Sequence, residues 1–371
     1  MNPIHPCEPV PPLTSIAHLL AVFLTLGGIP VYAASKTRDL ATEANGVIHF
    51  KGLPELKWKA VIRLPSSTTN ERILDGSVEG SGLSLQGQLR LGTTPGMGHW
   101  TLDSASLTIQ TWFSSLAGLP GFRDTLGDLT MMGELRGQGS GTLIRGNVNG
   151  RVDVHLSNAT LASESRALRV AGIDLSGEFE GPVPFRSIGF PSLTFIEASF
   201  SGIAAHLGRV DFAVTEDREV HIRSARVGVL GGTVEMRDTR FPLEAIFSGD
   251  VSAAVHLSNL NLKEISALLP DVIAEARGRL SGEIRIGWKP GEGFRLGNGR
   301  FQIERPESVE IRFTPQPGFL TSHTPERLTI LPSWTGPLHK WFCPPNPAYE
   351  TLRQIEMGLM SLQVETLSAE V

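Results

Sequence analysis

Two pairs of ionisable side chains recur in matching segments of this sequence and are the first candidates for chemistry. His155 and His256 each stand in a Val-His-Leu-Ser-Asn segment, and Glu178 and Glu283 each stand in a Leu-Ser-Gly-Glu segment. Neither histidine has a second ligand two or four residues further on, so surface histidines are a better interpretation than metal ligands. A carboxylate pair hydrolyses glycosides only at a defined separation, and exposed strand carboxylates are the default interpretation of the two glutamates.

The common catalytic and cofactor-binding motifs are missing. The sequence contains no nucleophile elbow, Walker loop, zinc-protease pair or Rossmann fingerprint. Gly137–Gly141 is rich in glycine but has no following lysine and no helix to supply amide donors, so we predict a flexible connection between strands. Cys7 and Cys343 lie at opposite ends, which excludes a disulfide framework and a cysteine-based zinc site. We expect no enzyme activity, cofactor or metal.

Composition favours strands and turns over helices. The 371 residues include 40 Gly and 25 Pro, which divide a chain into short elements and penalise long helices. Net charge is −5 with acidic and basic residues intermixed, and the absence of a basic stripe argues against nucleic-acid binding.

Apolar residues recur at every second position along most of the chain. Leu83–Leu91 is the clearest case, with apolar residues or Gly at odd positions and polar residues at even ones. Because strand side chains alternate between faces, this pattern predicts antiparallel sheet with one apolar and one polar face. The same alternation occurs in 105–109, 152–156, 210–214, 251–257, 280–286, 301–303 and 309–313. Predicted turns are Asp75-Gly76, Gly231-Gly232, Pro290-Gly291 and Gly297-Asn298-Gly299.

Helices and an internal repeat complete the predicted organisation. Short helices are expected at 262–269, capped by Asn261, at 348–357 and at 112–119, none long enough to form a layer. The segments 154–161 and 255–262 resemble each other, and so do 175–179 and 280–284 downstream of them. Repeated strand groups in a fixed order predict a growing sheet or a solenoid.

The first 35 residues resemble a leader. Leu19–Val31 is largely apolar, and Val31 and Ala33 are the small residues that a signal peptidase requires before a cut after Ala33. No Lys or Arg precedes the apolar run, which leaves a poor membrane anchor, or a start inside a longer gene, as alternatives.

The alternation of apolar residues is compatible with two uses of the apolar face. Two sheets could bury it in a sandwich, or one curved sheet could leave it as a trough for acyl chains, whose burial contributes about 0.8 kcal/mol per CH₂.

Four segments resemble a known family. They are 225–234, 257–265, 276–284 and 296–303, in this order, and they are similar to the C-terminal part of the YdbH-like members of the AsmA-like group, which transport phospholipid between bacterial membranes. Residues 36–200 resemble the family only in their general sequence character. The resemblance implies a periplasmic, taco-shaped β-groove between the inner and outer membranes of Gram-negative bacteria. The family continues with a further strand where this chain ends, beyond Leu362–Glu365, so truncation and an unpaired edge open to another β-groove chain are expected.

We therefore predict a mainly β protein with an extended, curved antiparallel sheet forming an open groove, plus a few short helices. The expected organisation is a leader (1–35), an N-terminal groove segment (36–200) and a C-terminal, YdbH-like segment (201–371). The expected partners are phospholipid acyl chains and components of the inner or outer membrane, and the expected location is the periplasm, by export or by tethering to the inner membrane. The candidate groove-lining residues are Val255, Leu257, Leu280, Ile284, Ile286, Phe301, Ile303, Val309 and Ile311.

Two alternatives compete with this hypothesis. A secreted adhesin, built as a β-solenoid or sandwich, would bind surface polysaccharide through exposed aromatic residues such as Trp100, Trp112 or Trp334. An exported polysaccharide-active enzyme would depend on Glu178 or Glu283.

Overall fold

A computed structural model gives the fold of the chain in two compact units. Unit 1 comprises residues 1–194 and 212–220, and unit 2 comprises residues 195–211 and 221–371. The structure describes residues 41–49, 53–63, 71–94, 96–117, 128–145, 147–182, 185–243, 245, 251–289, 293–303, 309–328, 343–364 and 366–369. The predicted leader, Trp334 and the Pro290-Gly291 turn lie outside these residues.

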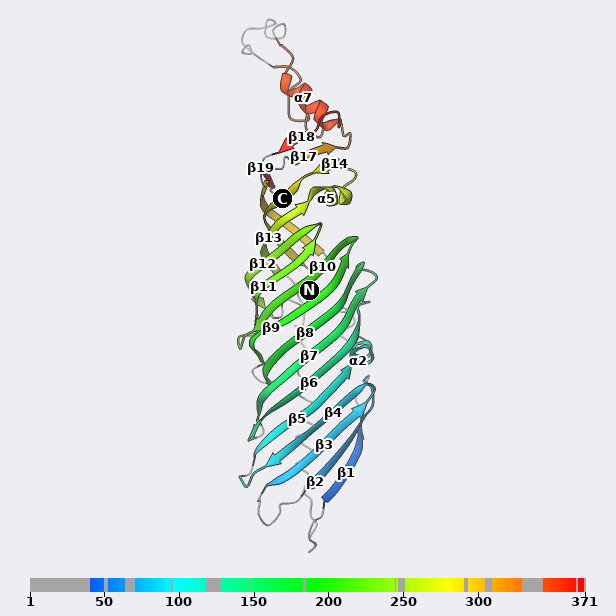
Figure 1. The fold of residues 1–371 in the computed structure, drawn as a ribbon, viewed down its shortest axis with the longest axis vertical. Coiled ribbons are helices and arrows are strands. Elements are labelled where there is room, and N and C mark those ends of the chain that lie inside the picture. Colours follow the sequence, from blue (N-terminus) through cyan, green and yellow to red (C-terminus); the bar gives the residue numbers. More distant parts are fainter. Residues whose placement is uncertain are drawn as a thin grey trace, which may run out of the picture. The chain divides into compact units, whose positions relative to one another are not determined.

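One antiparallel sheet dominates the described residues. It has sixteen strands, and its order follows the sequence from β1 to β13 and continues with β15, β16 and β19 (Figure 1). The order begins at β1 and ends at β19 without returning, so the sheet is not closed into a barrel. Three short helices accompany it among these residues. The prediction of a mainly β fold on an extended, open antiparallel sheet is confirmed.

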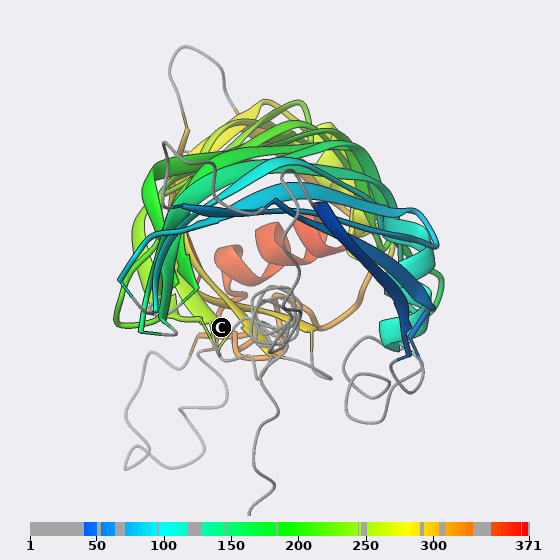
Figure 2. The same ribbon diagram turned by 90° about the horizontal axis from the view of Figure 1, so that it is seen from below.

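Unit 1 is built from long neighbouring strands and one helix, α2 (Ile109–Ala117). The strands bend along their length, so this part of the sheet is curved (Figure 2). Two buried apolar clusters, one around Leu89 and Trp100 and one around Leu56 and Trp112, lie among its side chains. The strands of this unit are β1 (Ala41–Ile48), β2 (Leu56–Arg63), β3 (Arg72–Gly80), β4 (Leu83–Leu91), β5 (Met97–Thr108), β6 (Thr130–Ile144), β7 (Asn147–Ser163) and β8 (Leu168–Pro182).

Unit 2 adds a second, smaller sheet to its share of the large one. β14 (Ile273–Arg277), β17 (Val309–Phe313) and β18 (Leu362–Val364) form this three-stranded sheet. Helix α5 (Leu262–Leu268) contacts β13 and β14, and helix α7 (Pro347–Glu356) contacts β17. The large-sheet strands of the unit are β12 (Gly232–Pro242), β13 (Val251–Asn261), β15 (Arg279–Lys289), β16 (Gly293–Ile303) and β19 (Thr366–Ala369). β9 (Arg186–Phe200), β10 (Ile203–Val214) and β11 (Glu219–Val229) contribute residues to both units.

The helix predictions are confirmed with shifted ends. The Asn261 side chain accepts a hydrogen bond from the Lys263 amide and caps α5, as expected from its sequence. Helix α2 begins three residues earlier than predicted, so Ile109 belongs to this helix and not to a strand. The predicted C-terminal strand is β18, which pairs with β17 on one side and lies at the edge of its sheet.

Several glycine-based turn predictions are wrong because many glycines lie inside strands. Asp75-Gly76 is in β3, Gly137–Gly141 is in β6, and Gly297-Asn298-Gly299 is in β16, where the register against β15 shifts. At two glycines inside strands, a side chain would collide with an aromatic ring of a neighbouring strand. A Cβ on Gly141 would lie 2.7 Å from Nε1 of Trp100, and one on Gly282 would lie 3.0 Å from the Phe301 ring. Large apolar side chains therefore rest on glycines of neighbouring strands.

The internal repeat corresponds to the same backbone irregularity in both copies. Asn158 and Asn259 have φ of 46° and 58°, and the strand register shifts at each of them. Their amides leave the regular ladder and donate instead to Asp174 Oδ1 at 2.8 Å and to Ser281 Oγ at 2.9 Å. Each copy thus contains a β-bulge, stabilised by a side-chain acceptor on the next strand.

The contact between Trp100 and its glycines is testable by adding one methyl group. A Cβ on Gly150 would lie 2.3 Å from Cζ2 of Trp100 and 2.5 Å from the Ser140 carbonyl oxygen. We expect Gly150→Ala to lower the free energy of unfolding by about 1–3 kcal/mol, because both the indole and the neighbouring β6 backbone must move. Urea unfolding measures this. Gly92→Ala is the control, since a Cβ there meets nothing within 4 Å; equal losses in both variants would contradict the packing described.

Candidate functional site

No second sheet of comparable size packs on the apolar face of the large sheet within the described residues. Among the element pairs with extensive contacts in the described residues, its strands contact their sheet neighbours or a short helix. A sandwich would require two such sheets face to face, about 10 Å apart. The apolar face is therefore the first candidate for a functional surface.

In unit 1 the register places apolar residues and glycines in continuous rows across the strands. Leu89 is opposite Trp100, and both are buried, at 2% and 6% exposed. A row crosses six strands, and its members, from β2 to β7, are Ile62, Leu74, Leu89, Trp100, Gly141 and Gly150. A second row, from β2 to β8, contains Trp58, Val78, Leu85, Ala105, Gly137, Val154 and Gly177.

In unit 2 the predicted groove residues of β13, β15 and β16 form similar rows. Val255 is opposite Ile284, and Met236 of β12 continues this row on the other side. Leu257 is opposite Gly282, which is opposite Phe301. Val255, Ile284 and Phe301 are buried, whereas Leu257 and Ile286 are partly exposed against the same cluster. The structure thus brings these predicted residues onto one face.

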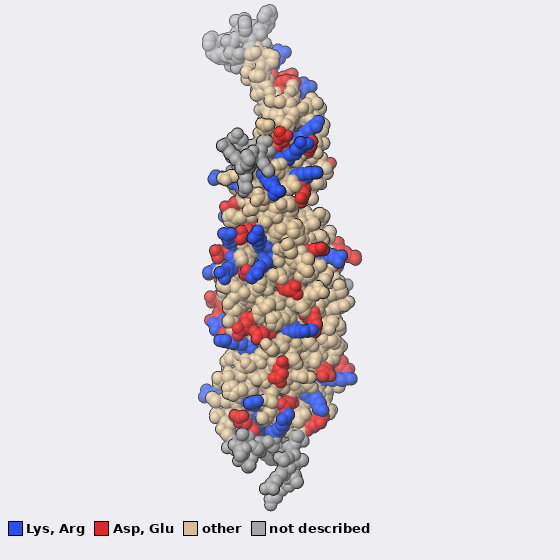
Figure 3. All heavy atoms as spheres, in the orientation of Figure 1, with Lys and Arg blue, Asp and Glu red and all other residues tan. Residues whose placement is uncertain are grey.

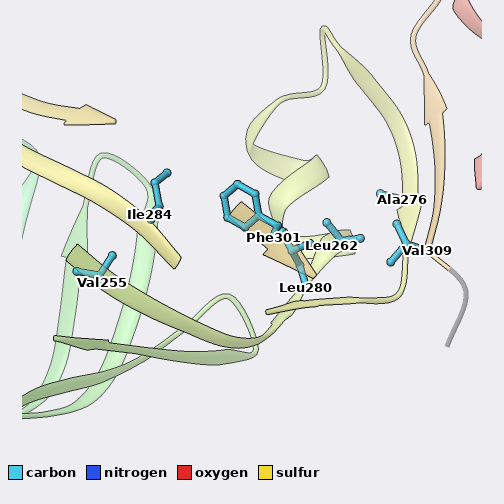
Figure 4. Close-up of a cluster of buried hydrophobic side chains, with 7 residues drawn as sticks. All are labelled: Val255, Leu262, Ala276, Leu280, Ile284, Phe301 and Val309. Carbon is cyan, nitrogen blue, oxygen red and sulfur yellow. The ribbon is translucent and has the colours of Figure 1, made fainter. Parts of the chain in front are cut away.

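The remaining predicted residues differ in position. Val309 and Ile311 belong to the small sheet, so the expectation that all candidates lie on one continuous sheet is wrong. They pack at one end of the apolar cluster, where Figure 4 shows Val309 beside Ala276 and Leu280 beside Leu262. The physical reason is α5, which separates β13 from β14 and directs the chain into a new sheet. Ile303 is opposite Leu280 in the backbone register, and its side chain lies outside the described residues.

The opposite face of the sheet is polar and mixed in charge. Lys and Arg are interspersed with Asp and Glu over the face shown in Figure 3. Glu178 is 3.6 Å from Arg151, and Glu283 is 3.8 Å from His256, all with exposed side chains. His155 is exposed, and no group of three potential metal ligands occurs among the described residues. These residues are a solvated strand face.

Sequence reasoning missed the aromatic residues of the apolar face. The adhesin hypothesis requires Trp100 and Trp112 to be exposed sugar-binding platforms, but they are 6% and 7% exposed and belong to the buried clusters of unit 1. The Trp100 indole donates to the Asn149 carbonyl oxygen at 3.1 Å. The alternating pattern around Trp100, with Gly98 and Leu102 two residues away, was the available signal.

Comparison with known families identifies the chain. Residues 34–323 match the family model described as YdbH-like, intermembrane phospholipid transport protein YdbH. The chain belongs to the YdbH-like family. The match covers most of the chain and begins far before Ala225, so the resemblance extends over the N-terminal strands as well as the four C-terminal segments.

The other comparisons found no further relatives of this YdbH-like chain. No curated protein and no solved structure matches it. Among the described residues, none of the helices has the length and apolar character needed to cross a membrane.

A buried carboxylate organises the C-terminal end of this YdbH-like fold. Glu356, at the end of α7, is 3% exposed and accepts hydrogen bonds from the amides of Gly318, Leu320 and Thr321 and from the Thr321 hydroxyl. Burial raises the pKa of Glu356, but these hydrogen bonds outweigh it and hold the pKa below its ordinary value of 4.5. The ionised carboxylate thus ties the 318–321 segment to α7.

This lowered pKa predicts a defined pH dependence. A carboxyl group whose pKa is lower in the folded protein than in the unfolded chain stabilises the fold at pH values above its pKa in the unfolded chain. This stabilisation is lost as the pH falls through the pKa of the folded protein. We expect Glu356→Gln to lower the melting temperature at neutral pH and to make it less sensitive to acidification below pH 4.5. Glu350→Gln, on the exposed side of the same helix, is the control. If both variants keep the wild-type acid dependence, Glu356 does not tie the segment.

Proposed function

We propose that this chain moves phospholipid between the two membranes of the cell envelope by holding acyl chains against the apolar face of its sheet. The observation that carries the proposal is this face, apolar in row after row and without a second sheet of comparable size packed on it in the described residues. Membership of the YdbH-like family supports phospholipid as the cargo.

The energetics explain why an apolar face suffices. Each CH₂ removed from water contributes about 0.8 kcal/mol, so a diacyl lipid with about 30 methylenes would cost on the order of 25 kcal/mol to carry through water. A protein that covers these methylenes removes most of this cost without any catalytic group. The polar face, with its intermixed ion pairs, is suited to contact with water.

We assign different tasks to the residues of the apolar cluster in unit 2. Leu257 and Ile286 are partly exposed and are the acyl contacts, backed by the buried Val255 and Ile284. Leu280 and Phe301 pack against Leu262 of α5, and Val309 and Ile311 pack behind them, so these residues end the face.

Location and partners follow from the transport proposal. The chain acts in the periplasm, exported or tethered by its first 35 residues, and exchanges lipid with components of the inner and outer membranes. Among the described residues, β19 pairs with Gly299–Gln302, and the part of β16 that has no partner there is an edge to which a strand of another β-groove chain could add.

The rival functions have less support. A polysaccharide-binding adhesin would expose Trp100 and Trp112, and both are buried. A polysaccharide-active enzyme would use Glu178 or Glu283, and each of them lies beside a basic side chain on the exposed polar face.

Two adjacent residues of β15 provide a matched test, because they face opposite sides of the sheet. Ile286 packs against the apolar cluster, and Arg285 is exposed on the other face. We expect Ile286→Gln to reduce the phospholipid that co-purifies with the protein several-fold, since an amide placed against acyl chains loses its hydrogen bonds to water. Arg285→Gln should leave the amount unchanged. Mass spectrometry of the extracted lipid measures both, and equal lipid content in the two variants, or none in the wild type, would contradict the proposal.

A further inference from the structure

A charged cavity lies on the small sheet, on the side away from the apolar cluster. Its volume is about 320 Å³, and its lining residues are Glu275, Arg277, Glu310, Arg312, Leu359 and Ser361. The alternation of β14 and β17 explains this position: Ala276 and Ile311 face the apolar cluster, and the charged residues between them point the other way.

The four ionisable groups of the cavity have a net charge of zero, but they differ in the hydrogen bonds and ion pairs that they form. Arg277 is paired with Glu275 at 2.7 Å. Arg312 uses only Nε, which donates to the Gly358 carbonyl oxygen at 2.7 Å. Within the described residues, the terminal amino groups of Arg312 and the carboxylate of Glu310 form no direct hydrogen bond. Glu310 lies opposite Arg277 in the strand register and interacts with it electrostatically, but both of its carboxylate oxygens lack a direct hydrogen bond within the described residues. The cavity therefore presents the terminal amino groups of Arg312 and the carboxylate oxygens of Glu310 to a ligand.

An exposed apolar turn lies at the rim of this cavity. Gly358 ends α7 with φ of 66°, and the amides of Gly358 and Leu359 donate back to the carbonyl oxygens of Ile355 and Gln354. The residue after such a glycine commonly packs on the last turn of its helix, but Leu359 is 75% exposed and Met360 is 43% exposed. The bond from Arg312 to Gly358 fixes this turn beside the charged groups.

We infer that this cavity binds the zwitterionic headgroup of a phospholipid that remains in a bilayer, with its phosphodiester on Arg312, its ammonium group on Glu310, and Leu359 and Met360 entering the membrane interface. A planar guanidinium suits phosphate oxygens, and a carboxylate suits an ammonium group. The choice of phospholipid rests on the proposed transport function, whereas the site is separate from the apolar face. It docks this end of the chain on a membrane.

Vesicle flotation of the full chain tests the inference. One set of vesicles contains equal amounts of phosphatidylethanolamine and phosphatidylglycerol, and the other contains phosphatidylglycerol alone. We expect the wild type to prefer the mixed vesicles. Glu310→Lys should shift the preference towards phosphatidylglycerol by about three- to fivefold, the effect of one exposed ion pair, and Leu359→Asp should weaken binding to both. Glu310→Gln, which should abolish the preference without reversing it, serves if Glu310→Lys does not fold.

A control variant distinguishes binding in this cavity from a general effect of surface charge. Glu283→Lys makes the same charge change on an exposed strand outside the cavity and should keep the wild-type preference. If it behaves like Glu310→Lys, or if neither variant alters the preference, the inference is overturned. Soluble glycerophosphoethanolamine should compete with the mixed vesicles; equal competition by inorganic phosphate would indicate a site for a bare anion and overturn the zwitterion assignment.

The proposed transport function has a separate readout in the same samples. Glu310→Lys should retain wild-type amounts of co-purified phospholipid, because the apolar face is unchanged. If the wild type carries lipid but does not prefer the mixed vesicles, headgroup binding in the cavity is refuted and acyl binding is not. If the wild type prefers the mixed vesicles but carries no co-purified lipid, acyl binding is refuted and headgroup binding is not.

Discussion

Removal of apolar side chains from water is the interaction on which this fold depends. A sheet with one apolar face ordinarily buries that face against a second sheet or a helix layer. Here the strands of the large sheet contact their neighbours, and the described helices are short. Leu89 is buried in a cluster of side chains from neighbouring strands, and Val255 is buried in a cluster to which α5 and the small sheet also contribute. Such a face gains further stabilisation from any apolar guest that covers it.

Glycine and β-bulges allow the face to stay continuous. Trp100 rests over Gly141 and Gly150, and Phe301 rests beside Gly282, so bulky side chains lie across neighbouring strands instead of standing apart. Bulges at Asn158 and Asn259 increase local twist, as expected where a strand must follow a curved sheet. The abundance of glycine therefore reflects space inside strands as much as turns between them.

Much of this architecture is predictable from local patterns, and the errors have physical causes. Alternation predicts Leu83–Leu91 with its observed bounds, and Asn261 marks the start of α5. The prediction for Gly137–Gly141 is wrong because a glycine that opens a turn and one that accommodates an indole look the same in a sequence. The separate sheet that contains Val309 and Ile311 depends on long-range pairing, which no local pattern encodes. Periodicity finds the apolar residues, but only the structure shows that, among the described residues, no large second sheet packs on them.

The central claim is that acyl chains lie on the apolar face and not on the polar one. Site-specific photo-crosslinking at Leu257 and at its neighbour His256, on opposite faces of β13, tests this most directly. The account predicts phospholipid adducts from a probe at position 257 and almost none from a probe at position 256. Equal adduct yields at both positions, or no adduct at 257 in protein that carries phospholipid, would contradict it.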